Sequence, residues 1–298
     1  MSVEAAQQVR TLIQQASRRL QDAGQSNARH EAEWLLGRLT GSRPLELYLR
    51  EAPIPPQTVT VFEAEVEARA LGTPLQYLLG EAEFCGEPFG VAPGVFIPRP
   101  ETECLVQEVV AALGPRGPRR SPLRVLELGV GSGCIAISLA KQVEACVVVG
   151  VELSWKALEV ARANVFRHGL AARIGLVQGS WVDPVSGRFD VVVSNPPYIP
   201  SARVDALPLD VRHEPRLSLD GGPDGMRDLT HLARALPERL APGGLAAFEC
   251  GEEQVVPLED QLRRGGWAAS VRPFQDLAGR PRGVVAVRAT EEHGQAPH

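Results

Sequence analysis

The chain has 298 residues, of which 44% are hydrophobic and 22% charged, as is typical of a globular protein with one or two domains. Its net charge of −5 gives no electrostatic help to nucleic-acid binding and favours a protein or small-molecule substrate. No apolar run approaches the roughly 18–20 residues of a membrane-spanning helix, and the N-terminus lacks the apolar block of a secretory signal. Five scattered cysteines without CxxC spacing favour free thiols in a reducing cytoplasm over disulfides or a zinc site.

The first part of the chain has the apolar spacing of amphipathic helices. Its first helix is marked by apolar residues three and four positions apart: Val9, Leu12, Ile13, Ala16 and Leu20. Ser26 or Asn27 is a suitable N-cap for a second helix, a short third helix follows Pro44, and a fourth begins near Gln57. We therefore expect a helical domain over residues 1–72.

Proline and glycine residues punctuate residues 73–98, which predicts a hairpin linker. From about residue 121 apolar strands and helices alternate, which is typical of a doubly wound α/β sheet. The predicted strands lie at 124–128, 145–151, 174–178, 189–194, 244–249, 267–271 and 284–288, and helices at 134–141 and 155–168. This second domain is expected to span 99–290, with a polar tail over 291–298.

A glycine-rich turn follows the first predicted strand of the sheet. Glycines let the backbone approach a ligand closely, and the helix that follows offers free N–H groups. Glu152 ends the second strand, where a carboxylate can accept both ribose hydroxyls. Either feature alone could be a tight turn or a solvated cap, but together they indicate an adenosine-containing cofactor. The candidate cofactor residues are Glu127, Gly129, Val130, Gly131, Ser132, Gly133 and Glu152.

The segment Asn195-Pro196-Pro197-Tyr198 directly follows the apolar strand that ends at Ser194. The prolines could simply end the strand, but the segment falls at the sheet edge where such folds bind ligands. A planar amide or exocyclic amine is a poor nucleophile, so its methylation depends on orientation. The Asn195 side-chain oxygen and the Pro196 carbonyl can each accept one N–H, and Tyr198 can stack on the planar group. This chemistry needs neither a covalent nucleophile nor a metal.

Further motifs occur along nearly the whole chain. They are FIPRPETE at 96–103, ELGVGSG at 127–133, VELSWKALEVARAN at 151–164, SNPPYIP at 194–200, HEP at 213–215, LDGGPDG at 219–225, FECGEEQ at 248–254 and DLAGRPRGVV at 276–285. With these motifs the chain resembles the HemK/PrmC family of peptide-chain release-factor glutamine methyltransferases. NPPY alone is shared with amino-methyltransferases of DNA and RNA, whereas the helical domain with FIPRPETE is far more specific.

The resemblance implies a class I (Rossmann-like) S-adenosylmethionine-dependent methyltransferase sheet, with the helical bundle and hairpin before it. It implies methyl transfer to the side-chain amide nitrogen (N5) of the glutamine in the Gly-Gly-Gln motif of release factors, which supports translation termination. By the same resemblance Trp181 flanks the adenine, and Asn195 contacts both the cofactor and the glutamine. Asn195, Pro196 and Tyr198 are the expected catalytic residues, and Pro197 completes the substrate site. The helical domain would dock a second surface of the release factor, and the chain is expected to be monomeric.

The chain departs from the family at a few positions. The family usually has Asp where this chain has Glu127 and Glu152, so each carboxylate reaches one methylene further. Ser180 replaces the acid often found before the tryptophan, which puts one adenine-side hydrogen bond in doubt.

Three other classes of protein share some of these features. A ribosomal-protein glutamine methyltransferase typically lacks the proline found here as Pro100. A nucleic-acid amino-methyltransferase is disfavoured by the acidic balance and by the lack of a basic, aromatic-interleaved stretch. A small basic cluster is more simply part of a solvated loop: Arg116, Arg119, Arg120 and Arg124. A non-catalytic cofactor-binding protein would not need Asn195 and Tyr198 beside the glycine turn.

Overall fold

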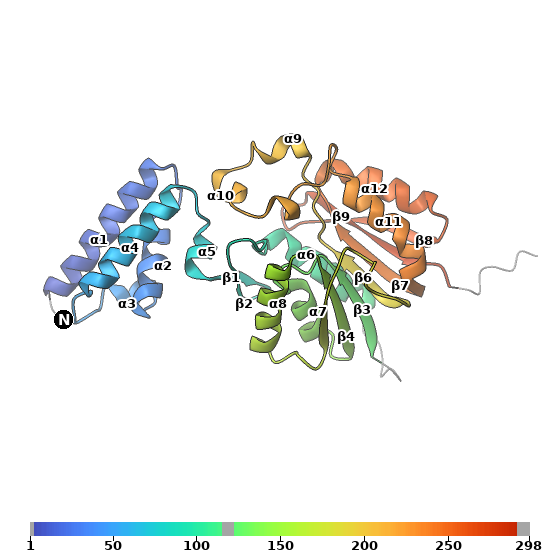
Figure 1. Ribbon diagram of the computed structural model, residues 1–298, viewed down its shortest axis with the longest axis horizontal. Helices are drawn as coiled ribbons and strands as arrows, with labels where there is room; N and C mark the ends of the chain where they lie inside the picture. Colours follow the sequence, from blue (N-terminus) through green and yellow to red (C-terminus); the bar gives the residue numbers. More distant parts are fainter. Residues whose placement is uncertain (1–2, 115–121, 291–298) are drawn as a thin grey trace, which may run out of the picture. The chain divides into compact units, whose positions relative to one another are not determined.

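A computed structural model describes residues 3–114 and 122–290. The predicted tail at 291–298 and three arginines of the basic cluster (Arg116, Arg119 and Arg120) lie outside the described residues. The chain divides into two compact units (Figure 1). We call Met1–Glu81 with Pro208–His213 the helical unit, and Ala82–Leu207 with Glu214–His298 the sheet unit. In the described ranges, no helix has both the length and the apolar character needed to cross a membrane.

Six helices make up the described part of the helical unit. They are α1 (Val3–Asp22), α2 (Ala28–Thr40), α3 (Pro44–Leu47), α4 (Pro56–Ala70), α5 (Leu75–Leu79) and α10 (Leu209–Arg212). Helices α1, α2 and α4 lie side by side and enclose apolar side chains such as Val9, Leu35 and Phe62 (Figure 1). The four helices predicted before residue 72 are confirmed. Asn27 is the N-cap of α2, although its side chain makes no capping hydrogen bond.

Helix α5 and the segment Pro208–His213 were not predicted as parts of this unit. The sequence predicted only a hairpin linker after residue 72, but Pro74 sets a helix-compatible start and Gly80 ends α5 in the left-handed conformation. The segment Pro208–His213 is far from the first 81 residues in sequence, so no local pattern could assign it to them.

Arg69 forms a buried ion pair inside the helical unit. Its Nε donates to Oε2 of Glu31 at 2.7 Å, and only 4% of Arg69 is exposed. The same guanidinium donates to the Gln25 side chain and to the Thr73 carbonyl, and lies 3.8 Å from the Asp210 carboxylate. One cation thus connects α2, α4, the chain before α5, and α10.

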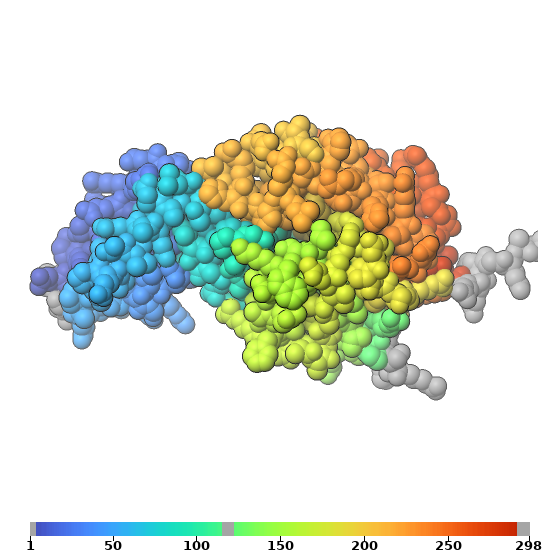
Figure 2. Space-filling model, in the orientation of Figure 1, coloured from blue at the N-terminus to red at the C-terminus, as the bar shows by residue number. Residues whose placement is uncertain are grey.

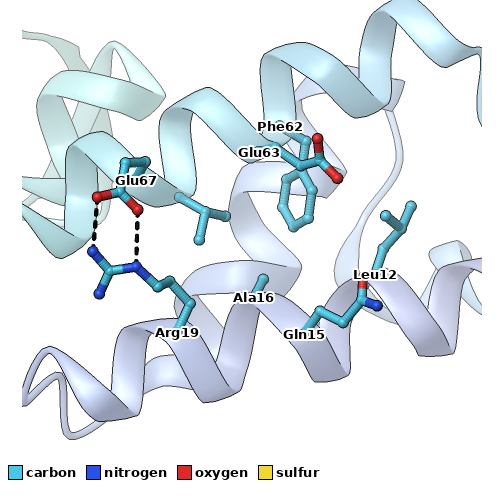
Figure 3. Close-up of a pocket in the computed structure, with 8 residues that line it drawn as sticks. Leu12, Gln15, Ala16, Arg19, Phe62, Glu63 and Glu67 are labelled. Carbon is cyan, nitrogen blue, oxygen red and sulfur yellow. Dashed lines mark hydrogen bonds and ion pairs between the residues drawn. The ribbon is translucent and has the colours of Figure 1, made fainter.

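A groove of about 170 Å³ lies between α1 and α4 (Figure 3). Leu12 and Phe62 line it, and Arg19 pairs with Glu67 at 2.7 Å across it. None of its eight lining residues is a predicted site residue.

The hairpin predicted within residues 73–98 is present, and it lies at the start of the sheet unit. Its strands are β1 (Glu81–Phe84) and β2 (Glu87–Gly90). The two turn residues, Cys85 and Gly86, both have positive φ, 50° and 74°, as a two-residue turn that matches the strand twist requires.

The main sheet has seven strands in the order β5-β4-β3-β6-β7-β9-β8. They are β3 (Leu123–Leu128), β4 (Cys146–Glu152), β5 (Ile174–Gln178), β6 (Phe189–Ser194), β7 (Leu240–Glu249), β8 (Ala268–Gln275) and β9 (Pro281–Arg288). Strands β3 to β7 pair in parallel, whereas β9 is antiparallel to both β7 and β8. All seven strands were predicted, and the doubly wound α/β fold is confirmed.

Helices cover both faces of this sheet. The helical elements of the sheet unit are α6 (Pro100–Leu113), α7 (Cys134–Gln142), α8 (Trp155–Arg167), α9 (Ser201–Val204), the 3-10 turn η1 (Arg216–Ser218), α11 (Arg227–Arg239) and α12 (Glu252–Arg264). Alternate strand residues point to opposite faces, so Val191 and Val193 pack with α6 and α7, and Val192 packs with α11 and α12. Helix α8 lies at the surface, in yellow-green in Figure 2, and exposes Trp155 and Phe166.

The strand order reverses between β3 and β6. Strands β4 and β5 continue to one side of β3, whereas β7, β9 and β8 continue to the other side of β6. In open α/β sheets, ligands bind outside the carboxyl ends of the strands at such a reversal. The glycine turn after β3 and the NPPY segment after β6 both begin at this point.

Candidate active site

The turn from β3 to α7 contains three glycines in the left-handed conformation. Gly129, Gly131 and Gly133 have φ values of 79°, 56° and 84°, which side chains with a Cβ adopt only with strain. Between them, Val130 and Ser132 are buried. The turn therefore brings backbone N–H groups and the start of α7 to the surface of the sheet edge, where an anionic or polar ligand group can approach.

Glu152 ends β4 and faces this turn. Its Oε2 accepts a hydrogen bond from the backbone N–H of Gly131 at 2.9 Å, and its Oε1 accepts one from the N–H of Ser154 at 2.8 Å. A carboxylate has about four acceptor positions, so each oxygen can accept another hydrogen bond. The Glu152 carboxylate is thus held in place with acceptor capacity for two hydroxyl groups.

Glu127 lies one strand residue before the turn and is fully buried. Neither carboxylate oxygen has an ion-pair partner or a hydrogen bond of normal geometry, and the nearest donor is the backbone N–H of Ala136. Burial raises the pKa of this carboxyl well above its ordinary value, and the charge of Glu152 raises it further. A buried, unpaired carboxylate is costly, so it fits a ligand that carries a positive charge or an N–H donor.

Trp181, for which the resemblance implied a place beside the adenine, lies against the glycine turn. Its φ of 45° is unusual for a large side chain. Its ring atom Cζ3 lies 3.5 Å from the position that a Cβ would take on Gly129. An aromatic face therefore borders the turn on the β5 side, where it could pack on a flat heterocycle.

A hydrogen bond of Ser194 connects the start of the NPPY segment to the residue before the glycine turn. The Ser194 hydroxyl donates to the carbonyl of Leu128 at 2.5 Å, which joins the ends of β6 and β3. Pro196 is buried, and Asn195 and Tyr198 are partly exposed. Asn195 Nδ2 donates a 3.0 Å hydrogen bond to Oγ1 of Thr102 in the first turn of α6.

The hydroxyl of Tyr198 is held by an ion pair between the buried Glu249 and the partly exposed Arg282. It donates to Oε1 of Glu249 at 3.0 Å, and Nη2 of Arg282 lies 3.0 Å from the hydroxyl and 3.3 Å from the same carboxylate oxygen. Burial, and secondarily the Glu249 charge, raise the pKa of Tyr198 far above its ordinary value of 10.0. Tyr198 therefore stays neutral and is unsuited to act as a base.

The start of α6 is itself anchored. Glu214, which is 5% exposed, accepts a hydrogen bond from the N–H of Ile97 at 2.9 Å and pairs with Arg99. Two motifs, FIPRPETE and HEP, thus fix the helix end that carries Thr102.

Thr102, Glu249 and Arg282 were not predicted as site residues, although each lies in a quoted motif. Glu249 offered a signal, because it is an acid at the carboxyl end of an apolar strand, on the edge where ligands bind. Thr102 and Arg282 offered none, since their contacts depend on how distant segments pack. The predicted residues, by contrast, all lie at the carboxyl ends of β3, β4, β5 and β6 or on the turns that follow these strands.

Comparisons with known proteins agree with this geometry. The family model described as PrmC N-terminal domain matches residues 11–80, and the model described as Methyltransferase small domain matches residues 102–207. The chain is 40% identical to the release factor glutamine methyltransferase of Moorella thermoacetica, covering 95% of this chain and 99% of that protein. It is 44% identical to the protein of the same name in Geobacter sulfurreducens, and the match covers 83% of this chain and 86% of that protein.

Among solved structures, a 16S rRNA N2 G1207 methyltransferase of T. Thermophilus in complex with AdoMet and guanosine has a TM-score of 0.50. The match covers 70% of this chain and 49% of that chain at 22% identity, and so it shows the fold alone.

The sheet order and the methyltransferase family model define a class I S-adenosylmethionine-dependent methyltransferase. Identity of 40% or more across most of the chain is specific enough to go further. The chain belongs to the family of release factor glutamine methyltransferases.

Proposed function

We propose that this chain transfers a methyl group from S-adenosylmethionine to the side-chain amide nitrogen of the Gly-Gly-Gln glutamine in peptide-chain release factors, and so supports translation termination. The observation that carries the proposal is the fixed amide of Asn195. Its Nδ2 is used by Thr102, which leaves Oδ1 to accept an N–H of a substrate amide. The relatives named above are named for this activity.

The residues around the glycine turn suit S-adenosylmethionine, which supplies an electrophilic methyl group on a sulfonium. Glu152 would accept the ribose hydroxyls, and Trp181 would pack on the adenine. The unpaired carboxylate of Glu127 would face the amino-acid end, where it offers an acceptor to a cationic group. The backbone from Gly129 to Gly133 would line the cofactor, and Asn195 would border both ligands.

The NPPY segment would bind the glutamine by shape and hydrogen bonding. Asn195 Oδ1 and the Pro196 carbonyl would each accept one N–H, which holds the amide plane while Pro197 stiffens the loop. Tyr198 would supply a flat face, since its hydroxyl is already tied to Glu249. A neutral Tyr198 takes no proton, so the amide proton would leave to water after transfer.

The helical unit would serve as the recognition module for a second surface of the release factor. We propose functional boundaries of 1–72 for this domain, 73–98 for the linker and 99–290 for the methyltransferase domain. The enzyme would act as a cytoplasmic monomer, without nucleic acid as substrate.

The test is methyl transfer from labelled S-adenosylmethionine to a purified release factor, beside a copy whose Gly-Gly-Gln glutamine is alanine. Label on the first and none on the second is the expected result. In parallel, Asn195→Ala should lose transfer while keeping cofactor binding. Label on neither release factor, with cofactor binding intact, would overturn the proposal in favour of a ribosomal-protein or nucleic-acid substrate.

A further inference from the structure

Asn164 on α8 is a buried polar residue to which the proposed reaction gives no role. Only 2% of it is exposed, and its side-chain amide makes three hydrogen bonds to backbone groups. Oδ1 accepts the N–H of Gly90 at 2.8 Å, while Nδ2 donates to the Gly90 carbonyl at 2.9 Å and to the Ser132 carbonyl at 2.8 Å. One side chain thus joins the end of β2 to the glycine turn after β3.

The direction of the Asn164 amide is fixed by the chemistry of its backbone partners. A backbone N–H can only donate and a carbonyl can only accept, so Oδ1 must face the Gly90 N–H and Nδ2 must face the two carbonyls. The two bonds to Gly90 are of the kind that a neighbouring antiparallel strand would make, so β2 supports the amide. A Cβ on Gly90 would stand only 3.1 Å from Oδ1. Asn164 therefore presents a closely held donor to Ser132.

The peptide between Ser132 and Gly133 determines the shape of the glycine turn. Both of its polar groups are bonded, since the Ser132 carbonyl accepts from Asn164 and the Gly133 N–H donates to the Val130 carbonyl at 2.9 Å. Gly133 has a φ of 84°, and because glycine tolerates both signs of φ, this residue alone does not prevent the peptide from flipping. A flipped peptide would break both bonds and leave the buried Nδ2 of Asn164 short of an acceptor, which is costly. Asn164 therefore favours one conformation of the turn.

We infer that Asn164 is a positioning residue for S-adenosylmethionine binding, which holds the glycine turn in its binding conformation through the Ser132 carbonyl and uses Gly90 as its support. The turn is then held from two elements, because Glu152 at the end of β4 accepts the N–H of Gly131 while α8 supplies the donor to Ser132. This inference rests on the role proposed above for the glycine turn.

The test compares Asn164→Ala with His168→Ala by titration calorimetry of the whole chain with S-adenosylmethionine. Asn164→Ala should raise the Kd about tenfold, because a turn that is competent in about a tenth of the molecules binds with about a tenth of the affinity. At saturating S-adenosylmethionine the kcat for release-factor methylation should be unchanged, because the bound ligand restores the turn. His168 is the matched control: its Nε2 lies 3.1 Å from the Pro88 carbonyl and its ring packs on Phe89. His168→Ala should loosen the same hairpin but keep the bond to Ser132, so its Kd should match wild type.

A second variant decides the matter if Asn164→Ala does not fold. Gly90→Ala places a Cβ 3.1 Å from Oδ1, so the Asn164 amide must shift while every core side chain is kept. Its Kd should rise about two- to fivefold, as a partial shift of the same equilibrium does, with a urea midpoint close to wild type.

A wild-type Kd in Asn164→Ala, or an equal rise of the Kd in His168→Ala, would overturn the inference. If Asn164→Ala does not fold, a wild-type Kd in Gly90→Ala would overturn it. Failure of the wild-type chain to bind S-adenosylmethionine would instead refute the proposed function.

Discussion

The backbone N–H of Gly131 donates a 2.9 Å hydrogen bond to the carboxylate of Glu152. This bond ties the glycine turn after β3 to the end of β4 before any ligand is considered. The same carboxylate accepts the N–H of Ser154, so one side chain holds Gly131 and Ser154 together. The proposed ribose acceptor is therefore also a support of the turn.

Replacing Glu152 by Ala should weaken S-adenosylmethionine binding about 10- to 100-fold, since hydrogen bonds to a charged group contribute about 1.5–3 kcal/mol. Titration calorimetry on the purified protein measures the change. Glu144→Ala, which removes an exposed acid just before β4, is the control and should bind as wild type does. An unchanged Kd in Glu152→Ala would remove Glu152 from the cofactor site.

Glu127 should make the cofactor-free protein less stable as the pH rises. Its pKa is raised in the folded state from an ordinary 4.5, so above pH 4.5 the folded protein holds a proton that the unfolded chain has lost. The free energy of unfolding should therefore fall with pH, by at most about 1.4 kcal/mol per unit, until the folded pKa is passed. Urea denaturation across this range should show the slope in wild type and a smaller one in Glu127→Gln. The same pH dependence of the unfolding free energy in wild type and Glu127→Gln would contradict this role of Glu127.

Removing the Tyr198 hydroxyl should affect stability more than chemistry. Tyr198→Phe deprives Glu249 of one of its hydrogen-bond donors, which should cost about 1 kcal/mol in unfolding free energy. The ring remains, so kcat should fall less than tenfold. The control is Tyr48→Phe, which loses a hydroxyl bond to Glu33 in the helical unit. A loss of transfer as complete as that of Asn195→Ala would assign the hydroxyl a direct role in the reaction.

Arg69→Ala should unfold the helical unit selectively. The change leaves the buried Glu31 carboxylate without its cation, and breaking such a pair costs about 3–5 kcal/mol. Amide hydrogen exchange should rise throughout α2 and α4, while the core strands of the sheet unit stay protected. Arg19→Ala, which breaks an exposed pair with Glu67, should change exchange much less. Equal increases in hydrogen exchange in Arg69→Ala and Arg19→Ala would contradict the prediction that the buried ion pair stabilises the unit more than the exposed one.

The strands and the candidate site turns could be predicted because their signals are local. Apolar runs such as Ile174–Gln178 and Phe189–Ser194 are bounded by polar or turn residues, and the structure gives these two strands the same limits. The glycine turn and the NPPY segment follow such strands directly. Their place at one sheet edge follows from parallel pairing.

No limits were predicted for helices α11 and α12, although His231 of α11 was expected to lie in a helical segment. Pro237 and Pro257 lie inside them, and proline normally argues against a helix interior. Apolar side chains such as Leu232 and Leu258 pack on the sheet, and this burial outweighs the local signal.

The Thr102–Asn195 contact could not be predicted for a different reason. The two residues are 93 positions apart, and their meeting depends on how α6 packs against the sheet at β7. The Arg282–Tyr198 contact spans 84 positions and depends on β9 pairing beside β7. The sequence gives the type of each residue, but no local pattern in it predicts which distant residues will be in contact.

The insertion of β9 between β7 and β8 has a consequence for the timing of biosynthesis. Arg282, which holds the hydroxyl of Tyr198, lies on β9, the last strand of the described chain. A chain folds as it emerges from its N-terminal end, so the helical unit and the parallel strands can form while the ion pair is still incomplete. In a nascent chain the glycine turn after β3 can therefore form before the hydroxyl of Tyr198 is held, and the ion pair is complete only after translation has passed residue 282.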